Sequence, residues 1–265
     1  MFDNLLPLRV SDNQRFLVHS NGEPFFYLGD TAWELFHRTN REEADHYLRN
    51  RAAKGFTAIQ AVVLAELDGL HSPNSYGHCP LIDDDPTKPN PAYFEHVDYI
   101  VKRCAELRMW MAMLPTWGDK WNHAWGVGPE IFTPANAEFF GEFLAQRYVE
   151  MPIIWDLGGD RKVETDAHYE ILRGFARGIR KVDRHSLITL HPAAGGFEIF
   201  PKLVAEDWLS FTSIQSGHVF ELLDNYYAIR KLYNETTPVK PCLEMEPCYE
   251  EHPVMGHGWK PGWME

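Results

Sequence analysis

The chain has 265 residues, 45% of them hydrophobic, so it is long enough to enclose one substantial core. Its 38 acidic and 25 basic residues give a formal net charge of -13, which argues against a nucleic-acid-binding protein and favours a neutral substrate. No apolar run approaches the roughly 20 residues of a membrane span, and the N-terminus lacks the pattern of a signal peptide, so we expect a cytoplasmic protein without membrane contact.

Two short apolar segments open the chain. Residues 15–19 and 24–29 flank an Asn-Gly pair at 21–22 that is typical of a hairpin turn. The sequence therefore predicts a small strand pair that plugs the floor of a barrel, with the second segment as the first strand of the barrel itself. A capping pattern then predicts a helix over 40–52.

Strands and helices are predicted to alternate along the rest of the chain. Predicted strands lie at 56–64, 110–115, 153–157, 187–191, 210–215 and 241–245, and predicted helices lie at 90–107, from 133, at 166–182 and at 220–234. Short apolar strands that alternate with helices indicate a parallel sheet covered by helices. Seven such units in a chain of this length favour the α/β class and a closed (β/α)8 TIM-type barrel.

The eighth unit of that barrel is missing from the predicted elements. We expect one catalytic barrel domain over residues 1–265, with residues 1–22 as its N-terminal strand pair and with a barrel that is truncated at its C-terminal end. An open barrel exposes strand edges. We expect the gap to be covered by the strand pair or by a second copy of the chain in a homo-oligomer, or to stay open in an unstable product.

Acidic residues follow two of the predicted strands. Asp160 comes after the fourth strand, separated from it by Gly158-Gly159, and Glu246 follows the seventh strand. The carboxyl ends of barrel strands meet at one mouth, where a retaining glycosidase needs two carboxyl groups about 5 to 5.5 Å apart. Strand alternation gives Glu244 the same facing as Glu246, and Glu250 also competes, so spacing alone does not choose the second carboxylate.

Seven motifs occur in one order along the chain. They are Gly-Asp-Thr-Ala-Trp at 29–33, Lys-Gly-Phe-Thr at 54–57 with Gln60, Asn-Ser-Tyr-Gly at 74–77, Leu-Pro-Thr-Trp-Gly-Asp-Lys-Trp at 114–121, Trp-Asp-Leu-Gly-Gly-Asp-Arg at 155–161, Gln-Ser-Gly-His at 215–218 and Glu-Pro-Cys-Tyr-Glu at 246–250. Together they resemble the apiosidase family of glycoside hydrolases, family 140, from about residue 5 to residue 265. The resemblance implies a (β/α)8 barrel and retaining release of the branched pentose apiose from plant glycosides or pectic glycans, without a cofactor. It also implies Asp160 as the acid/base and Glu246 as the nucleophile.

Further residues near the predicted strand ends are candidates to bind the carbohydrate substrate. Each has a structural alternative, because polar side chains often support a site from behind, most Trp residues pack under loops, and Asp160 itself can pair with Arg161. The candidates for hydrogen bonding are Asp30, Gln60, His191, Gln215, His218 and Glu250, and the candidates for stacking are Trp117, Trp121 and Tyr249.

Two other kinds of protein compete with this interpretation. A metal-dependent barrel hydrolase is suggested by the 13 His residues. The first strand is followed by Gly-Asp-Thr rather than His-x-His, however, and His252 and His257 lack an obvious third ligand, so we expect no metal site. A non-catalytic glycan-binding protein would keep the aromatic loops without needing both carboxylates, and turnover of an apioside separates it from an enzyme.

Overall fold

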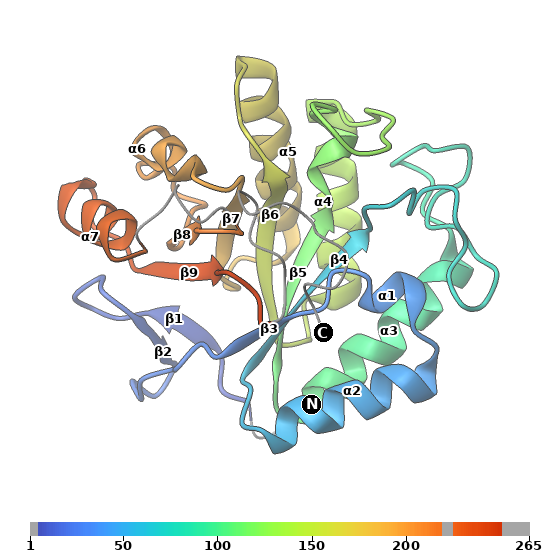
Figure 1. Ribbon diagram of the computed structural model, residues 1–265, viewed down its shortest axis with the longest axis horizontal. Coiled ribbons are helices and arrows are strands. Elements are labelled where there is room, and N and C mark those ends of the chain that lie inside the picture. The colour runs from blue at the N-terminus through green and yellow to red at the C-terminus, as the bar shows by residue number, and fades with distance from the viewer. Residues whose placement is uncertain (1–4, 219–224, 251–265) are drawn as a thin grey trace, which may run out of the picture.

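A curved parallel sheet forms the centre of the fold (Figure 1). The computed structural model describes residues 5–218 and 225–250. The five strands of the sheet are continued by a separate pair, and the seven strands are β3 (Gly29–Thr31), β4 (Ala58–Leu64), β5 (Trp110–Thr116), β6 (Ile153–Arg161), β7 (Ile188–Pro192), β8 (Thr212–Gln215) and β9 (Cys242–Glu246). The first five pair in this order, and β8 pairs with β9. The N–H of Ser210 donates to the carbonyl of Ile188 over 2.7 Å, which links the start of the second pair to the edge of the first sheet.

Helices cover the outside of this sheet (Figure 1). They are α1 (Leu35–Arg38), α2 (Arg41–Ala53), α3 (Pro91–Glu106), α4 (Pro134–Tyr148), α5 (Asp166–Val182), α6 (Phe200–Leu203) and α7 (Asn225–Glu235), with 3-10 turns at Gly118–Lys120 and Gly196–Ile199. Helices α2 to α5 each begin at a cap whose side chain accepts a hydrogen bond from a backbone N–H of the first turn, which confirms the predicted starts. The caps are Asn40, Asn90, Thr133 and Thr165. None of the helices in the described residues is long and apolar enough to cross a membrane.

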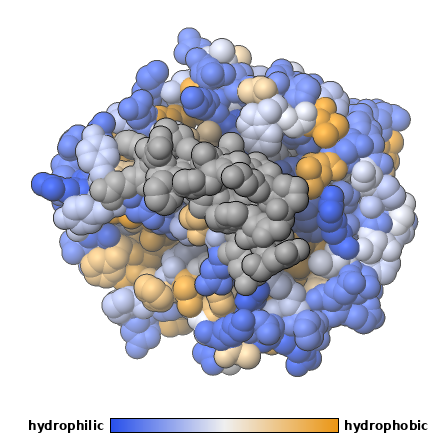
Figure 2. Space-filling model, viewed as in Figure 1, coloured by the Kyte–Doolittle hydropathy of each residue, from blue (hydrophilic) through white to orange (hydrophobic). Residues whose placement is uncertain are grey.

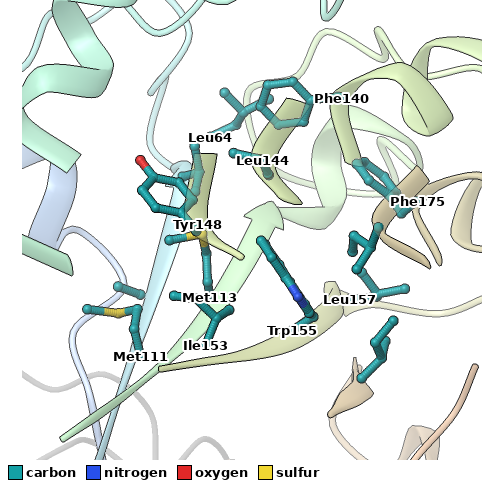
Figure 3. Close-up of a cluster of buried hydrophobic side chains, with 14 of the residues drawn as sticks. Leu64, Met111, Met113, Phe140, Leu144, Tyr148, Ile153, Trp155, Leu157 and Phe175 are labelled. Atoms are coloured by element: carbon teal, nitrogen blue, oxygen red, sulfur yellow. The ribbon is translucent and has the colours of Figure 1, made fainter. Parts of the chain in front are cut away.

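Alternate strand residues point to two different cores. Side chains on the outer face of β5 and β6 interdigitate with those of α4 and α5 (Figure 3). This alternation is what the predicted strand period requires, because successive side chains of a strand point to opposite faces. The outer core includes Met111, Met113, Phe140, Leu144, Tyr148, Ile153, Trp155, Leu157 and Phe175.

The inward-facing residues at the starts of the strands form an apolar floor. They pack against Leu8 and Leu17, which belong to the antiparallel hairpin of β1 (Leu8–Val10) and β2 (Leu17–His19). The other buried residues of this cluster are Ala58, Trp110, Ala112, Ile154 and Met245, which lie in strands, and Leu187 and Phe211, which each lie directly before a strand. The hairpin of β1 and β2 therefore packs against the floor, where a strand pair was expected.

The pairing of the hairpin differs from the prediction. The predicted partner of 15–19 was the segment 24–29, but β2 pairs with β1, and the predicted partner makes one bridge, between Val18 and Pro24. The hydrogen bonds of this bridge run from the N–H of His19 to the carbonyl of Glu23 and from the N–H of Phe25 to the carbonyl of Leu17, and the segment forms no longer strand beside β2. The first barrel strand is correspondingly short and covers only Gly29–Thr31.

The described residues contain seven parallel strands in a curved wall that is consistent with a TIM-type barrel. In a closed barrel an eighth strand would lie between β9 and β3 and pair with both. No strand of the described residues takes this place. Gln60 links these strands instead, because its amide nitrogen donates to Thr31 Oγ1 over 2.9 Å and to the carbonyl of Met245 over 2.8 Å. Residues 251–265, which follow β9, lie outside the described residues, so the absence of an eighth unit stays a prediction.

The surface seen in Figure 2 is mainly hydrophilic, in keeping with the acidic composition. Hydrophobic residues gather in patches on this face. Several large apolar side chains near the N-terminal hairpin are exposed, namely Leu6, Phe16, Phe26 and Leu28. Exposed apolar patches are typical of interaction surfaces, but the homo-oligomer stays a prediction.

Candidate active site

The interior of the barrel becomes polar toward the carboxyl ends of its strands. Above the apolar floor, buried Asp156 on β6 and His191 on β7 point inward, and Glu246 lies at the end of β9. Buried polar groups are costly unless they are paired, so this cluster marks the part of the core that is not built for stability alone.

Asp160 lies on a bulge at the end of β6. The φ angles of Gly158, Gly159 and Asp160 are 99°, 95° and 55°, and the register with β7 shifts between Gly158 and Arg161. A Cβ on Gly159 would lie 2.8 Å from backbone atoms of two neighbouring residues, so glycine is required there. Aspartate adopts a positive φ more readily than most residues with a side chain, so the bulge can carry a carboxylate directly after its two glycines.

The environment of Asp160 favours its protonated form. Burial, and after it the negative charge of Glu246, raise the pKa of Asp160 to about 6. His191, Arg161 and the nearby amide of Gln215 act in the opposite direction. A salt bridge to Arg161 was the structural alternative for Asp160. Arg161 Nη1 is 3.8 Å from the carboxylate of Asp160 but donates to its backbone carbonyl over 2.7 Å, so the closer contact between the two residues is to the backbone.

A second bulge separates Glu246 from Glu244. Ile214 pairs with Glu244, whereas the next residue, Gln215, pairs with Glu246. Glu244 Oε1 accepts from the backbone N–H groups of Ser216 and Glu246. The carboxylate of Glu246 instead contacts imidazoles, which strand alternation could not predict.

Two histidines hold the carboxylate of Glu246. Oε2 lies 2.8 Å from His191 Nε2, and Oε1 lies 3.5 Å from His218 Nε2. Burial raises the pKa of Glu246, but the hydrogen bonds from His191 and His218 outweigh it and bring the pKa to about 2. Burial lowers the pKa of His191, but Glu246 and Asp156 raise it to about 9. Glu246 and His191 are therefore an ion pair at neutral pH.

Asp156 lies behind this ion pair, and our sequence analysis did not single it out. It is 0% exposed, and its Oδ2 lies 3.7 Å from His191 Nδ1. Neither carboxylate oxygen has a hydrogen-bond partner among the described residues. Burial, opposed by His191, raises the pKa of Asp156 to about 7. The sequence could have indicated Asp156, because it is a charged residue inside an otherwise apolar predicted strand.

Glu66 is a further carboxylate that sequence analysis missed. It lies two residues after the end of β4, and burial together with the charges of Glu34, Asp160 and Glu246 raises its pKa to about 7. The signal was its position as the first charged residue after the second barrel strand.

Three of the predicted binding residues lie beside the carboxylate pair. Gln215 is buried near Asp160, and the rings of His218 and Tyr249 have their centroids 4.6 Å apart. Burial, and after it the charge of Glu246, raise the pKa of Tyr249. These contacts bring Gln215, His218 and Tyr249 together with Asp160 and Glu246.

The two tryptophans predicted to stack on the substrate lie in different surroundings. Trp117 is 3% exposed, and its ring centroid lies 6.3 Å from that of His191. Trp33 completes this wall, with centroids 5.3 Å from Trp117 and 5.1 Å from His191. Trp121 is 2% exposed and donates from Nε1 to the carbonyl of Gly158 over 2.9 Å, so it supports the bulge and offers no open face for stacking.

Three other predicted binding residues have contacts of their own or are exposed. Asp30 is turned to helix α2, where its Oδ2 lies 2.7 Å from Tyr47 Oη and 2.5 Å from Arg51 Nε. Gln60 is occupied by its two hydrogen bonds to the strands on either side of the barrel gap. Glu250 is exposed at the end of the second described range.

Within residues 5–218 and 225–250, no group of three or more His, Cys, Asp or Glu side chains is arranged to hold a metal ion. His252 and His257, weighed above as metal ligands, lie outside the described residues.

Comparisons with known proteins agree with this architecture. Residues 11–265 match the family described as "Apiosidase-like, catalytic domain". A solved structure of a glycoside hydrolase has a TM-score of 0.81 and 30% identity, and the match covers 96% of this chain and 59% of that one. A glycoside hydrolase of family 5 from Bacteroides vulgatus has a TM-score of 0.80 and 31% identity, with 95% of this chain and 56% of that one covered.

A more distant structure shares the fold alone. The catalytic domain of an endoglucanase from Thermobifida fusca has a TM-score of 0.59 at 14% identity, with 97% of this chain and 78% of that one covered. The chain spans less than two thirds of the length of the two more similar structures. None of the curated proteins compared with the chain matches it.

Proposed function

The chain belongs to the apiosidase-like catalytic-domain family, and from this membership we propose that it is a retaining glycoside hydrolase of the family 140 type. Its substrates are apiosides of plant origin, either small glycosides or pectic glycans, and it releases apiose. We also propose that residues 1–265 act as one barrel domain. No cofactor is needed, because two carboxyl groups supply all the proton transfers and the nucleophile.

The observation that carries the proposal is the opposite perturbation of two neighbouring carboxyl groups. The pKa of Asp160 is raised to about 6 by burial and by Glu246, while that of Glu246 is brought to about 2 by its histidine partners in spite of burial. A retaining pair needs one carboxyl group that keeps its proton and one that stays ionised. The proposal includes a separation of about 5 to 5.5 Å between them.

The first half of the reaction forms a glycosyl ester. A carboxylate oxygen of Glu246 attacks the anomeric carbon of apiose while the bond from that carbon to the leaving oxygen breaks. Asp160 gives its proton to the leaving oxygen, so the leaving group departs as a neutral alcohol. His191 donates to Glu246 and holds it ionised and oriented before the attack.

The second half returns the enzyme to its starting state. Once Glu246 is esterified, its negative charge no longer raises the pKa of Asp160, so Asp160 is left as a carboxylate. Asp160 then takes a proton from a water molecule whose oxygen attacks the anomeric carbon. The ester bond breaks, Glu246 regains its charge, and apiose leaves with the configuration of the substrate.

Hydrolysis of an aryl apioside and of a natural apioside tests the proposal. Proton NMR of the first product formed should show retention of the anomeric configuration. Glu246→Gln should abolish turnover of both substrates. Asp160→Asn should slow the natural apioside far more than the aryl one, whose leaving group needs little protonation, and azide should partly restore turnover of the aryl apioside. Inversion, or activity that chelators remove and these substitutions do not, would disprove the mechanism.

A further inference from the structure

Asp156 is a buried carboxylate that takes no part in the proton transfers of the proposed reaction. Its side chain is 0% exposed, and neither of its carboxylate oxygens has a hydrogen-bond partner among the described residues. A buried carboxylate without such partners costs free energy, and an apolar side chain would fill the same place in the strand without that cost. The position of Asp156 therefore calls for an explanation in the chemistry of the site.

The sheet places Asp156 directly below His191. Asp156 pairs with Thr189 across β6 and β7, and His191 lies two residues further along β7. Residues two apart in a strand face the same way, so both side chains point into the barrel. The carboxylate therefore meets the imidazole from the layer beneath it, with 3.7 Å between Asp156 Oδ2 and His191 Nδ1.

The two ring nitrogens of His191 face two different carboxylates. Nε2 lies 2.8 Å from Glu246 Oε2, whereas Nδ1 faces Asp156 and has no hydrogen-bond partner in the described part of the chain. The indoles of Trp33 and Trp117 pack against the ring, with centroids 5.1 and 6.3 Å from its own, so the imidazole has little room to turn. The ring is therefore held with one nitrogen toward each carboxylate.

Formation of the glycosyl ester changes the charge around this imidazole. In the free enzyme the carboxylate of Glu246 is the partner of the His191 imidazolium, but an ester carries no charge. Burial lowers the pKa of His191, whereas Glu246 and after it Asp156 and Asp160 raise it. Once Glu246 is esterified, Asp156 is the one carboxylate of the described residues that remains within salt-bridge distance of the ring.

We propose that Asp156 is a positioning residue that keeps His191 protonated while Glu246 is esterified. The inference rests on the proposed function, because it concerns the covalent intermediate of that reaction. When the bond from the anomeric carbon to Glu246 breaks, its electron pair returns to the carboxylate, and the N–H at Nε2 of the imidazolium donates to the charge that develops there. His191 keeps both ring protons throughout.

Loss of the charge on Glu246 also favours the carboxylate form of Asp156. Burial raises the pKa of Asp156 to about 7, with Glu246 acting in the same direction and His191 in the opposite one. Esterification removes the contribution of Glu246, so a proton on Asp156 passes to the solvent and is taken back when Glu246 is regenerated. The other titratable groups beside His191 and Asp156 are Asp160 on β6, Glu244 on β9 and Tyr27 ahead of β3.

Kinetics with dinitrophenyl apioside separates the two half-reactions, because dinitrophenolate is released in the first and its leaving group needs little protonation. In Asp156→Asn, kcat should fall about ten- to hundredfold, since each unit by which the pKa of His191 drops below the working pH leaves about a tenfold smaller protonated fraction. KM should fall with it, so that kcat/KM changes by less than about twofold. A burst of dinitrophenolate that matches the amount of enzyme should precede the steady state.

Two further readouts separate this role from a structural one. The decline of kcat at alkaline pH should begin at a lower pH in Asp156→Asn than in the wild-type enzyme, because His191 in the intermediate loses its proton more easily. Glu106→Gln is a control, since it removes a partly exposed carboxylate that pairs with Arg103 on α3, and it should change neither kcat nor kcat/KM.

The charge of His191 in the intermediate can also be measured in the wild-type chain, so the test does not depend on the folding of a variant. A 2-deoxy-2-fluoro aryl apioside traps the glycosyl ester, mass spectrometry of the digested protein locates it on Glu246, and nitrogen NMR of labelled histidine reads the ring at pH 7. We expect a protonated His191 in the trapped wild-type enzyme and a neutral one in trapped Asp156→Asn.

Two results would overturn the inference. A neutral His191 in the trapped wild-type enzyme would show that Asp156 does not hold the proton, and equal losses of kcat and kcat/KM without a burst would give Asp156 a structural role only. Failure of the proposed function has a different pattern, because the wild-type enzyme would then neither turn over apiosides nor form a covalent adduct with the fluorinated apioside.

Discussion

Replacing Glu246 with Gln is expected to lower the pKa of Asp160. In the native chain, burial and then the charge of Glu246 raise this pKa from 3.8 to about 6. A rise of about two units corresponds to about 3 kcal/mol in favour of the protonated acid. The Asp160 side chain is only 16% exposed, so solvent screens this environment little. Gln removes the charge and leaves the burial, so we expect a fall of about one unit rather than a return to the usual value.

The variant Glu246→Gln is expected to be inactive, so the pKa of Asp160 cannot be read from its kinetics and has to be measured on the carboxyl group itself. Carbon NMR of Asp160, recorded across the acidic pH range, gives its pKa in the native chain and in the variant. In the active wild-type enzyme, kcat/KM should fall as the pH rises through about 6, because an ionised Asp160 has no proton to donate. Glu106→Gln is a matched control, since it removes a partly exposed carboxylate that pairs with Arg103.

Three results would refute this reasoning. If Asp160 titrates at the same pH in Glu246→Gln, burial alone sets its pKa and the two carboxyl groups are not coupled. If wild-type kcat/KM rises through pH 6, Asp160 is not the acid. Near-normal turnover by Glu246→Gln would remove Glu246 from the role of nucleophile.

Three further substitutions have expected outcomes. Asp160→Asn should stabilise the protein by about 2 to 3 kcal/mol at neutral pH, because a carboxyl whose folded pKa is raised to about 6 destabilises the fold once it is ionised. This gain should decline as the pH falls from about 6 to 3.8 and be absent below 3.8, and urea unfolding at pH 7 and at low pH measures it. Asp156→Asn should lower the pKa of His191 from about 9 by about one unit, as read by nitrogen NMR; an unchanged titration would mean that Glu246 alone holds the proton. Gly159→Ala should cost about 2 to 4 kcal/mol of unfolding free energy, because its Cβ would lie 2.8 Å from backbone atoms at a φ of 95°; a variant of native stability and activity would show that the bulge tolerates a side chain.

The helices were predictable because their signals are local. The expected helix over 166–182 agrees with α5 (Asp166–Val182), and the expected cap at Asn40 forms with Glu43 as its reciprocal partner. Both depend on residues within one turn of each other, so no distant contact is needed to fix them. The segment 24–29 shows the limit, since its pairing depended on competition with residues 8–10, which the local pattern did not reveal.

The sequence by itself also predicted carboxylates at the strand ends, although spacing alone left Glu244 and Glu250 open beside Glu246. Asp160 and Glu246 both follow apolar strands, and parallel strands bring their carboxyl ends to one edge whatever the loops between them. Their motifs additionally indicated the family, and the comparison over residues 11–265 confirms that membership.

Only the tertiary structure decided which way the individual side chains face. Asp30 turns outward to α2, and Trp121 is buried behind the bulge while Trp125, four residues later, is exposed. Glu244 and Glu246 separate because a bulge interrupts the two-residue period between them. Facing depends on register, and register is set by hydrogen bonds to strands that are distant in the sequence. A local pattern can therefore place a residue at the mouth of a barrel, but the neighbouring strands determine whether its side chain enters it.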